Sequence, residues 1–269
     1  MVTFPNCKIN LGLNILQKRE DGYHDLETVF FPVPFYDVLE VVSSDKTDLQ
    51  NTGVYAGKIE NNLCLRAFQL LKKDFPQLPE IKIHLHKSIP TGAGLGGGSA
   101  DAAFTLSLLN EKYNLNISSQ KLFEYALLLG SDCPFFILNK PVFATGRGEK
   151  MKEINLSLSG YKIIIINPDI HINTKETFQQ LSPVTPERNI NKIILQPIET
   201  WKNELVNDFE KIVFTQHSQI KKIKENLYDH NAMYASMTGT GSTVFGIFKS
   251  TDQIKLSIED GYFYKWISL

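Results

Sequence analysis

Glycine is concentrated in one short stretch of the chain, and this stretch constrains the fold more than any other feature. From Pro90 to Ala103 the sequence reads PTGAGLGGGSADAA, with five glycines within seven residues. Glycine reaches backbone conformations closed to other residues and lets the main chain approach a ligand closely, but each one costs conformational entropy on folding. So dense a run indicates a backbone that bends tightly or touches a ligand.

The residues on either side predict a strand before the glycines and a helix after them. Ile81, Ile83 and Leu85 alternate with polar residues, which is typical of a strand with one buried face. From Ser99 onward, small and apolar residues recur at spacings of three and four, as in a helix. A glycine loop between a strand and a helix start presents free N–H groups and the positive end of a helix dipole to an anion. We therefore expect the loop to bind the phosphates of a nucleotide.

The loop fits neither of the two commonest glycine fingerprints. A P-loop places Lys and then Ser or Thr directly after its last glycine, whereas Gly98 is followed by Ser99 and Ala100. The dinucleotide pattern G-x-G-x-x-G would need extra glycines and a parallel sheet. A flexible turn is the other interpretation, but flexible linkers rarely join a clear strand to a clear helix. The pattern favours a different class of phosphate loop.

Composition describes an ordinary globular chain of one large domain or two smaller ones. The 269 residues are 42% hydrophobic and 21% charged, with a formal net charge of -1. Without a long basic run, neither nucleic acid nor an anionic membrane is expected as a partner. No apolar run approaches the ~20 residues that span a bilayer, and we expect no signal segment before the first strand. Three widely spaced cysteines predict neither disulfides nor a zinc site, so we expect a cytoplasmic protein.

The first predicted strand, residues 8–15, carries polar side chains on one face. Apolar residues alternate with Lys8, Asn10 and Asn14, so a cation and an amide lie side by side. A half-solvated edge strand explains this pattern as well as a functional face does. Further on, Pro32 and Pro34 are expected to break or bulge a second strand before it resumes over residues 36–42.

Two further patterns predict helix starts and a turn. Asn173 with Glu176, and Asn207 with Glu210, resemble capping boxes. The sequence MTGTGS from Met237 joins two strand-like segments, and taken alone it predicts a hairpin.

Asp132 lies in a short connection, GSDCPFF from Gly130, that follows a predicted helix. Two interpretations stay open for its carboxylate. It caps the turn that Pro134 begins, or it is a chemical group held for a reaction.

Taken in order along the chain, these motifs resemble those of the GHMP family of small-molecule kinases, named for galactokinase, homoserine kinase, mevalonate kinase and phosphomevalonate kinase. Four separated motifs carry the resemblance: PNCKINLGL from Pro5, DGYHDLETVF from Asp21, PTGAGLGGGSADAA from Pro90 and GSDCPFF from Gly130. Three more support it: TGRGE from Thr145, NDFE from Asn207 and MTGTGSTVF from Met237. The likeness covers nearly the whole length of the chain.

The resemblance implies an α+β, two-lobed GHMP kinase-like fold. The N-terminal lobe, residues 1–153, would be similar to ribosomal protein S5 domain 2 and would bind the nucleotide. The C-terminal lobe, residues 154–269, would be ferredoxin-like. In that family the nucleotide and the substrate meet between the lobes. The polar stretch 150–160 is the expected boundary.

Within the family, the motifs are most similar to those of enzymes that phosphorylate the 2-hydroxyl of a cytidine-diphosphate-linked methylerythritol in non-mevalonate isoprenoid biosynthesis. The resemblance implies a small-molecule substrate and ATP with Mg²⁺. The ion would be held mainly by phosphate oxygens, so no metal-ligand cluster is expected. We expect a monomer or a weak homodimer.

The resemblance also implies functions for particular residues. Lys8 and Asp132 would be catalytic, at the reacting hydroxyl. Tyr23 and His24 would recognise the cytosine, with Phe178 either as a second stacking face or as a core residue. The ATP-binding residues would be Pro90, Thr91, Gly92, Ala93, Gly94, Leu95, Gly96, Gly97, Gly98, Ser99 and Ala100. The substrate-binding residues would be Asn10, Tyr23, His24, Phe178, Gly239 and Thr240.

The chain departs from the family pattern at two places. Ala100 stands where members often have a second Ser, so any hydroxyl contact to phosphate or Mg²⁺ would come from Ser99. The late loop reads Thr-Gly-Thr-Gly rather than Ser-Gly-Ser-Gly, which keeps the hydroxyls and stiffens χ1.

Two alternatives to this function stay open. Another GHMP kinase, of the homoserine or mevalonate type, would not need Tyr23 and His24. A catalytically silent nucleotide-binding regulator would bind ATP without turnover, although the pairing of Lys8 with Asp132 argues against it.

Overall fold

The computed structural model describes residues 1–54, 61–181, 183 and 189–269. By its internal contacts the chain forms two compact units, each built from segments that alternate along the sequence. The first unit comprises residues 1–8, 35–91 and 96–140, and the second comprises residues 9–34, 92–95 and 141–269. These units are not the consecutive lobes 1–153 and 154–269, which stay a prediction.

The first unit contains a four-stranded sheet with the strand order β1-β4-β6-β5. Strand β6 (Ile81–Lys87) is antiparallel to β4 (Val38–Ser43) and parallel to β5 (Asp48–Gly53), and β1 (Val2–Thr3) pairs with the other edge of β4. The predicted alternation in β6 is confirmed, because Ile81, Ile83 and Leu85 are buried.

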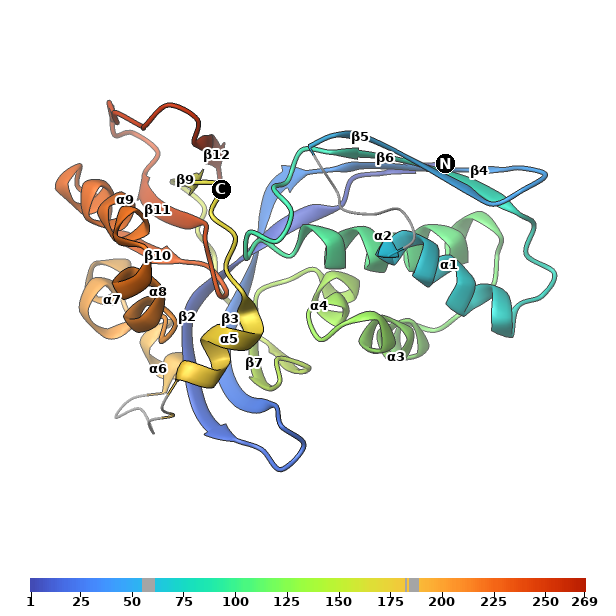
Figure 1. Ribbon diagram of the computed structural model, residues 1–269, viewed down its shortest axis with the longest axis horizontal. Helices are drawn as coiled ribbons and strands as arrows, with labels where there is room; N and C mark the ends of the chain where they lie inside the picture. The colour runs from blue at the N-terminus through green and yellow to red at the C-terminus, as the bar shows by residue number, and fades with distance from the viewer. Residues whose placement is uncertain (55–60, 182, 184–188) are drawn as a thin grey trace. The chain divides into compact units, whose positions relative to one another are not determined.

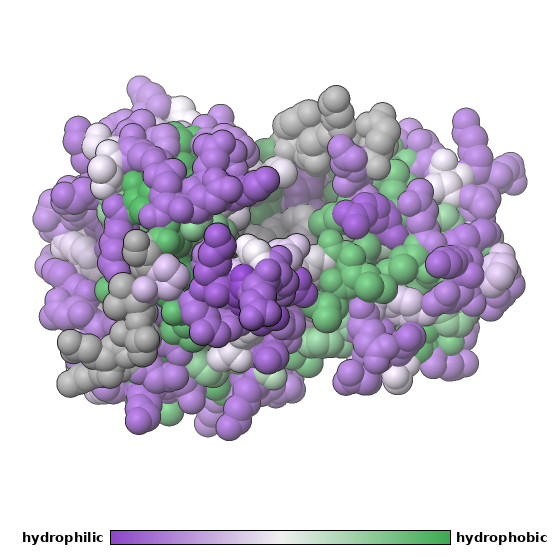
Figure 2. Space-filling view, turned by 60° about the horizontal axis from the view of Figure 1, so that its bottom comes forward, coloured by the Kyte–Doolittle hydropathy of each residue, from purple (hydrophilic) through white to green (hydrophobic). Residues whose placement is uncertain are grey.

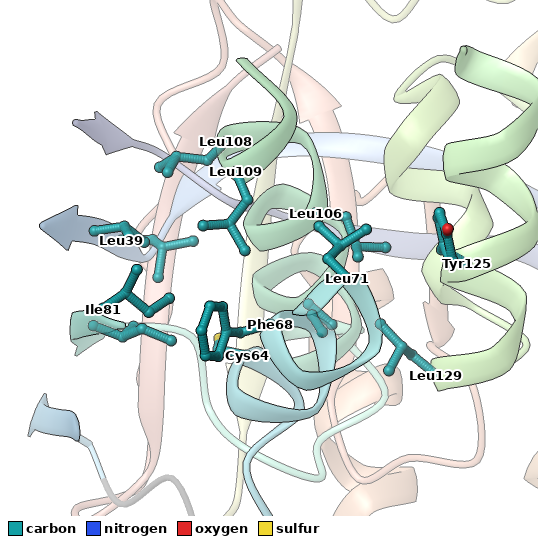
Figure 3. Close-up of a cluster of buried hydrophobic side chains, with 14 of the residues drawn as sticks. Leu39, Cys64, Phe68, Leu71, Ile81, Leu106, Leu108, Leu109, Tyr125 and Leu129 are labelled. Atoms are coloured by element: carbon teal, nitrogen blue, oxygen red, sulfur yellow. The ribbon is translucent and has the colours of Figure 1, made fainter. Parts of the chain in front are cut away.

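Helices cover one side of this sheet (Figure 1). They are α1 (Leu63–Asp74), α2 (Gly97–Lys112), α3 (Ser119–Leu129) and α4 (Cys133–Leu138). Helices α1 and α3 begin at side-chain caps, since Asn62 and Ser118 accept hydrogen bonds from first-turn amides. Figure 3 shows the core between helices and sheet, where Leu39 and Ile81 of the strands lie beside Phe68 and side chains of α2.

The second unit holds most of one sheet and all of another. The first has the order β2-β3-β7-β8 and the second the order β10-β11-β9-β12. Their strands are β2 (Asn6–Lys18), β3 (His24–Tyr36), β7 (Val142–Gly146), β8 (Lys150–Glu153), β9 (Tyr161–Asn167), β10 (Tyr234–Met237), β11 (Val244–Lys249) and β12 (Phe263–Ser268). The predicted hairpin is confirmed, because β10 and β11 are antiparallel neighbours joined by residues 238–243.

Five helices of the second unit are described. They are α5 (Thr174–Gln180), α6 (Ile190–Ile193), α7 (Ile198–Glu204), α8 (Glu210–Gln216) and α9 (Ser218–Asp229). Helix α9 packs on β10 and β11, as Figure 1 shows. Its Ile220 and Leu227 join Ile164 and Ile166 of β9 in a buried apolar cluster.

The structure tests three local predictions, one on a strand and two on helix caps. Pro32 and Pro34 do not break β3, because pairing with β7 ends at Phe30 and the prolines lie beyond that ladder. The capping box at Asn173 is confirmed, since its side chain accepts from two amides and contacts Glu176 at 2.6 Å. The one at Asn207 is wrong, because α8 has no side-chain cap.

The surface is mainly polar on the face that Figure 2 shows, with hydrophobic residues gathered right of its centre. Leu128 of α3 and Leu195 are among the exposed large apolar side chains. Within the described part of the chain, no helix combines the length and the apolar character needed to cross a membrane.

Candidate active site

Lys8 and Asp132 form an ion pair in the first unit. Lys8 Nζ lies 3.7 Å from Asp132 Oδ2, and the Lys8 side chain is buried while 38% of the Asp132 side chain is exposed. Burial lowers the pKa of Lys8, and the neighbouring Asp132 opposes that shift. Strand β2 lies at the edge of its sheet, but it is buried over Asn6–Ile15, so the prediction that its polar face is half-solvated is wrong. The pair therefore offers a buried cation beside an accessible carboxylate.

Asp132 stands at the N-cap position of α4 without capping the helix. Its backbone is in the right-handed helical region, with φ -85° and ψ -18°, and its side chain makes no capping hydrogen bond. A capping side chain needs an extended backbone at this position to reach the amides two or three residues further along the chain. The turn-capping interpretation is therefore wrong, and the carboxylate is directed at Lys8.

Gly96 places the start of α2 directly over the Lys8 side chain. It has φ +72°, and a Cβ there would lie 3.0 Å from the Phe136 ring and 3.1 Å from Lys8 Cγ. This approach and this conformation require glycine. The main chain at the start of α2 thus lies against the aliphatic part of the Lys8 side chain.

Within the described part of the chain, no side-chain hydrogen bond caps the N-terminus of α2. Its first helical bond runs from the Ala100 amide to the Gly96 carbonyl at 2.9 Å, and Gly96 provides no capping side chain. The amides of Gly97, Gly98 and Ser99 precede that bond and have no acceptor within the helix. With the positive end of the helix dipole, they suit an anion such as a phosphate group.

A buried charge cluster, Asp37, Lys87 and Asp101, ties the end of β6 to the start of α2. Lys87 Nζ contacts Asp37 Oδ2 and lies 2.7 Å from Asp101 Oδ2. Asp37 Oδ1 also accepts from the amides of Ser88 and Ile89, at 2.6 Å and 2.9 Å. Burial raises the pKa of Asp101 to about 7.

Sequence reasoning missed this cluster. Asp101 lies inside the glycine motif, and Lys87 is the last residue of the strand before it. Their nearness to the loop in sequence is the signal that could have identified both. Asp37 carries no comparable signal, because it is 50 residues from Lys87 in the chain and the fold alone brings them together.

In the second unit, Gly94 brings residues 92–95 against the loop of residues 237–242, here called the late glycine loop. Gly94 has φ +80°, and a Cβ there would lie 2.1 Å from the Thr238 carbonyl oxygen. The Thr238 hydroxyl lies 3.1 Å from the Gly94 carbonyl oxygen. The glycine spacing in the motif therefore also serves a contact between two loops.

Asn10 is buried, and its side chain is bound by other parts of the second unit. Its Oδ1 accepts from the Gly239 amide at 3.0 Å and lies 3.2 Å from the Thr238 hydroxyl. Its Nδ2 donates to Thr28 Oγ1 at 2.9 Å. These contacts hold β2, β3 and the late glycine loop together, and contact of Asn10 with substrate stays a prediction.

Thr240, predicted with Gly239 as a substrate ligand, contacts helix α5. It is half-buried, and its hydroxyl lies 3.0 Å from that of Thr174, the first residue of α5. The late glycine loop is thus also joined to the helix that carries Phe178.

The aromatic residues predicted for cytosine recognition lie on β3 and α5 or next to them. Tyr23 is 55% exposed, and the Arg147 guanidinium is 4.8 Å from its ring centroid. His24 stacks on Phe178 with a centroid distance of 5.1 Å and an interplanar angle of 26°. Phe178 also meets Phe209 edge-on at 4.8 Å, so its ring contacts both the core and His24. Burial lowers the pKa of His24, which favours the neutral imidazole at pH 7.

Comparison with known proteins identifies the family. The sequence matches the GHMP kinases N terminal domain over residues 62–140 and the GHMP kinases C terminal domain over residues 192–259. A 4-diphosphocytidyl-2-C-methyl-D-erythritol kinase of Bacteroides fragilis is 49% identical, with 98% of each chain covered. One of Bacteroides thetaiotaomicron is 52% identical over 93% of this chain and 92% of its own. The chain belongs to the GHMP kinase family.

Solved structures agree with this assignment. The crystal structure of a 4-(cytidine 5'-diphospho)-2C-methyl-D-erythritol kinase has a TM-score of 0.79 and 31% identity, covering 91% of this chain and 89% of its own. The mevalonate kinase of Methanococcus jannaschii has a TM-score of 0.71 at 13% identity, covering 100% and 98%, and shows the shared fold. The predicted membership of the GHMP kinases and their α+β fold are confirmed.

Proposed function

We propose that this GHMP kinase transfers the γ-phosphoryl group of ATP to the 2-hydroxyl of 4-diphosphocytidyl-2-C-methyl-D-erythritol. The products are ADP and the 2-phosphate. The observation that carries the proposal is the Lys8–Asp132 pair, which lies in the same unit as the uncapped N-terminus of α2. The choice of acceptor is supported by relatives about half identical to this chain that bear the name of that kinase.

Asp132 receives the proton of the attacking hydroxyl. The substrate oxygen forms a bond to the γ-phosphorus while the bond from the γ-phosphorus to the bridging oxygen breaks, and the hydroxyl proton passes to the Asp132 carboxylate. Phosphoryl transfer proceeds through a loose transition state in most descriptions, so the proton moves late and the carboxylate mainly aligns the hydroxyl. The accessibility of the Asp132 side chain suits this function.

Lys8 provides fixed positive charge at the transferring group. Its ammonium is buried, so its interaction with developing negative charge is stronger than it would be in water.

ATP is bound by the glycine loop, residues 90–100. The first-turn amides of α2 fit its phosphate groups, because the helix provides them no other cap. Mg²⁺ would come with the nucleotide, held largely by its phosphate oxygens, and would neutralise part of their charge. Ser99, half-buried in the first turn, is the hydroxyl of the glycine motif available to this end of the nucleotide.

Tyr23 and His24 bind the cytosine. A base stacked on an aromatic ring gains ~1–3 kcal/mol, and the exposed Tyr23 ring provides such a face. The neutral imidazole of His24 can exchange hydrogen bonds with the base edge. Phe178 holds the His24 ring by stacking.

An ADP-release assay tests this function. The purified protein is given ATP with Mg²⁺ and one of three alcohols: 4-diphosphocytidyl-2-C-methyl-D-erythritol, mevalonate or homoserine. We expect ADP release with the cytidyl substrate alone. Release with mevalonate or homoserine instead would assign another GHMP activity, and ATP binding without turnover on any of the three would indicate a regulator.

A further inference from the structure

The NDFE motif is accounted for neither by a helix cap nor by the proposed chemistry. Asn207 is buried, and its Nδ2 donates to two main-chain carbonyls, that of Met237 at 2.8 Å and that of Gly239 at 2.9 Å. Its Oδ1 accepts from the Phe209 amide at 3.0 Å. One amide side chain therefore holds the late glycine loop on both sides of Thr238.

Thr238, the residue between those two carbonyls, contacts Gly94 of the glycine loop. Its hydroxyl accepts from the Asn10 amide at 3.1 Å and lies 3.1 Å from the Gly94 carbonyl oxygen. Its own carbonyl occupies the space that a Cβ on Gly94 would need. The backbone at Gly94 is thus shaped by Thr238, which Asn207 in turn holds in place.

The two acidic residues of the motif fix Asn207 from either side. Asp208 Oδ2 accepts from the Ile15 amide of β2 at 2.9 Å. Glu210 Oε1 accepts from the Met237 amide at 2.8 Å, and its Oε2 pairs with Lys224 at 2.6 Å. Asn207 therefore sits between a strand of one sheet and the hairpin of the other.

We propose that Asn207 is a positioning residue, which acts through Thr238 to set the conformation of residues 92–95 and so the affinity for ATP. Two carbonyl oxygens that face one side chain require two N–H donors, which Asn has and which Asp, Ser and Leu lack. A buried carbonyl left without a donor is costly, so the loop would shift to find another. The proposal rests on the proposed function in taking ATP as the ligand of the glycine loop.

Asn207→Asp tests the proposal with little change in shape. At pH 8 a carboxylate would face two carbonyl oxygens and repel them, whereas at pH 6 a protonated carboxyl could donate to one. We expect the dissociation constant of ATP to rise about tenfold to a hundredfold at pH 8, and to return toward the parent value as the pH falls to 6. The Michaelis constant of the alcohol substrate should rise by a smaller factor than the dissociation constant of ATP, because Asn207 also holds Gly239 of the predicted substrate site.

The matched control is Asn226→Asp. Asn226 on α9 is also a donor to a main-chain carbonyl, that of Ser257 at 3.3 Å, but it is half-exposed and away from the late glycine loop. This variant should bind ATP like the parent at both pH values. The charged groups around Asn207 are Asp208, Glu210, Lys211 and Lys224, and all variants keep them. Their own titration is removed from the comparison because the ATP affinity of each variant is divided by that of the parent at the same pH.

ATP affinity is measured by calorimetry, so the outcome does not depend on turnover. A parent protein that binds ATP but fails in the ADP-release assay would refute the proposed function and still allow this test. Parent-like ATP affinity of Asn207→Asp at pH 8 would refute the positioning proposal. A merely structural change would weaken the binding of ATP and of the alcohol equally, with no recovery at pH 6. That result would also refute the positioning proposal.

Thr238→Val keeps the test decisive if Asn207→Asp does not fold. It removes the hydroxyl next to Gly94 and preserves the branched shape. We expect weaker ATP binding at every pH, without the recovery at pH 6. Unchanged ATP affinity in this variant would overturn the link from Asn207 to residues 92–95.

Discussion

The backbone conformation of Asp132 decides what its side chain can do. Because the residue is already helical, its carboxylate does not reach the amides of α4 and instead lies 3.7 Å from Lys8. Gly96 illustrates the converse, since its lack of a side chain lets the start of α2 pass over Lys8. At single residues, the site depends as much on φ and ψ as on chemical type.

Asp132→Asn should lower turnover by about 10²–10⁴ and leave ATP binding almost unchanged. The amide cannot take up the hydroxyl proton, while the loop that binds ATP is untouched. Steady-state kinetics and calorimetry measure the two effects separately. Asp229→Asn, at an exposed carboxylate that ends α9, is the control and should be fully active. Near-parent turnover of Asp132→Asn would remove this residue from the mechanism.

Gly94→Ala should abolish ATP binding in a protein that still folds. Its methyl group would overlap the Thr238 carbonyl, and φ +80° is strained for alanine. Gly160→Ala is matched in strain, with φ +88°, but a Cβ there meets nothing within 4 Å. Both variants should lose some stability in urea unfolding, and only the first should fail to bind ATP. Equal ATP affinities would contradict the assignment of the glycine loop.

At the scale of elements, two loops and a strand form one hydrogen-bonded assembly in the second unit. Strand β2 supplies Asn10, the hairpin of β10 and β11 supplies Thr238, and the segment before α8 supplies Asn207. Helix α5 is linked to β3 by the stacking of Phe178 on His24. Elements distant in sequence thus fix each other's polar groups in this unit.

Phe178→Ala should raise the Michaelis constant of the cytidyl substrate about tenfold, whether the ring stacks on the base or only holds His24. The Michaelis constant of ATP should not change. Phe214→Ala serves as the control, because Phe214 packs partly buried against the same apolar cluster but its ring lies beside Lys224. If both variants lost only stability, Phe178 would be a core residue without a part in substrate binding.

At the scale of the whole molecule, the buried charges of the first unit link stability to pH. The pKa of Asp101 is raised from 3.8 to about 7, mainly by burial, and its Oδ1 has no hydrogen-bond partner among the described residues. The folded state therefore holds a proton that the unfolded state releases at lower pH. The stabilisation is complete below about pH 4 and is lost as the pH rises through 7.

Asp101→Asn should remove this dependence. The free energy of unfolding, measured in urea at pH 5 and pH 8, should fall with pH more steeply in the parent than in the variant, by at most about 1.4 kcal/mol per pH unit. Asp37 and Lys87 contact the same carboxyl, Cys64 interacts with it electrostatically, and all three are kept in both proteins. Parallel curves would show that Asp101 is ionised throughout this range.

Local sequence patterns predicted the features that depend on neighbouring residues. The cap at Asn173 was foreseen because a helix start is encoded within four residues. The pattern at Asn207 was equally clear and led to the wrong structure, because the Glu210 carboxylate of the expected capping box binds the amide of Met237, 27 residues away. Tertiary contacts there outweighed the local preference.

The sequence by itself determined the GHMP kinase family, the strand and helix around the glycine loop, and the hairpin of β10 and β11, since each is encoded in short motifs of neighbouring residues. Only the tertiary structure decided that both faces of β2 are buried, that Asp37 and Asp101 share Lys87, and that Thr238 shapes Gly94. These contacts join residues far apart in the chain. Their geometry follows from how the elements pack, which no local spacing of residue types encodes.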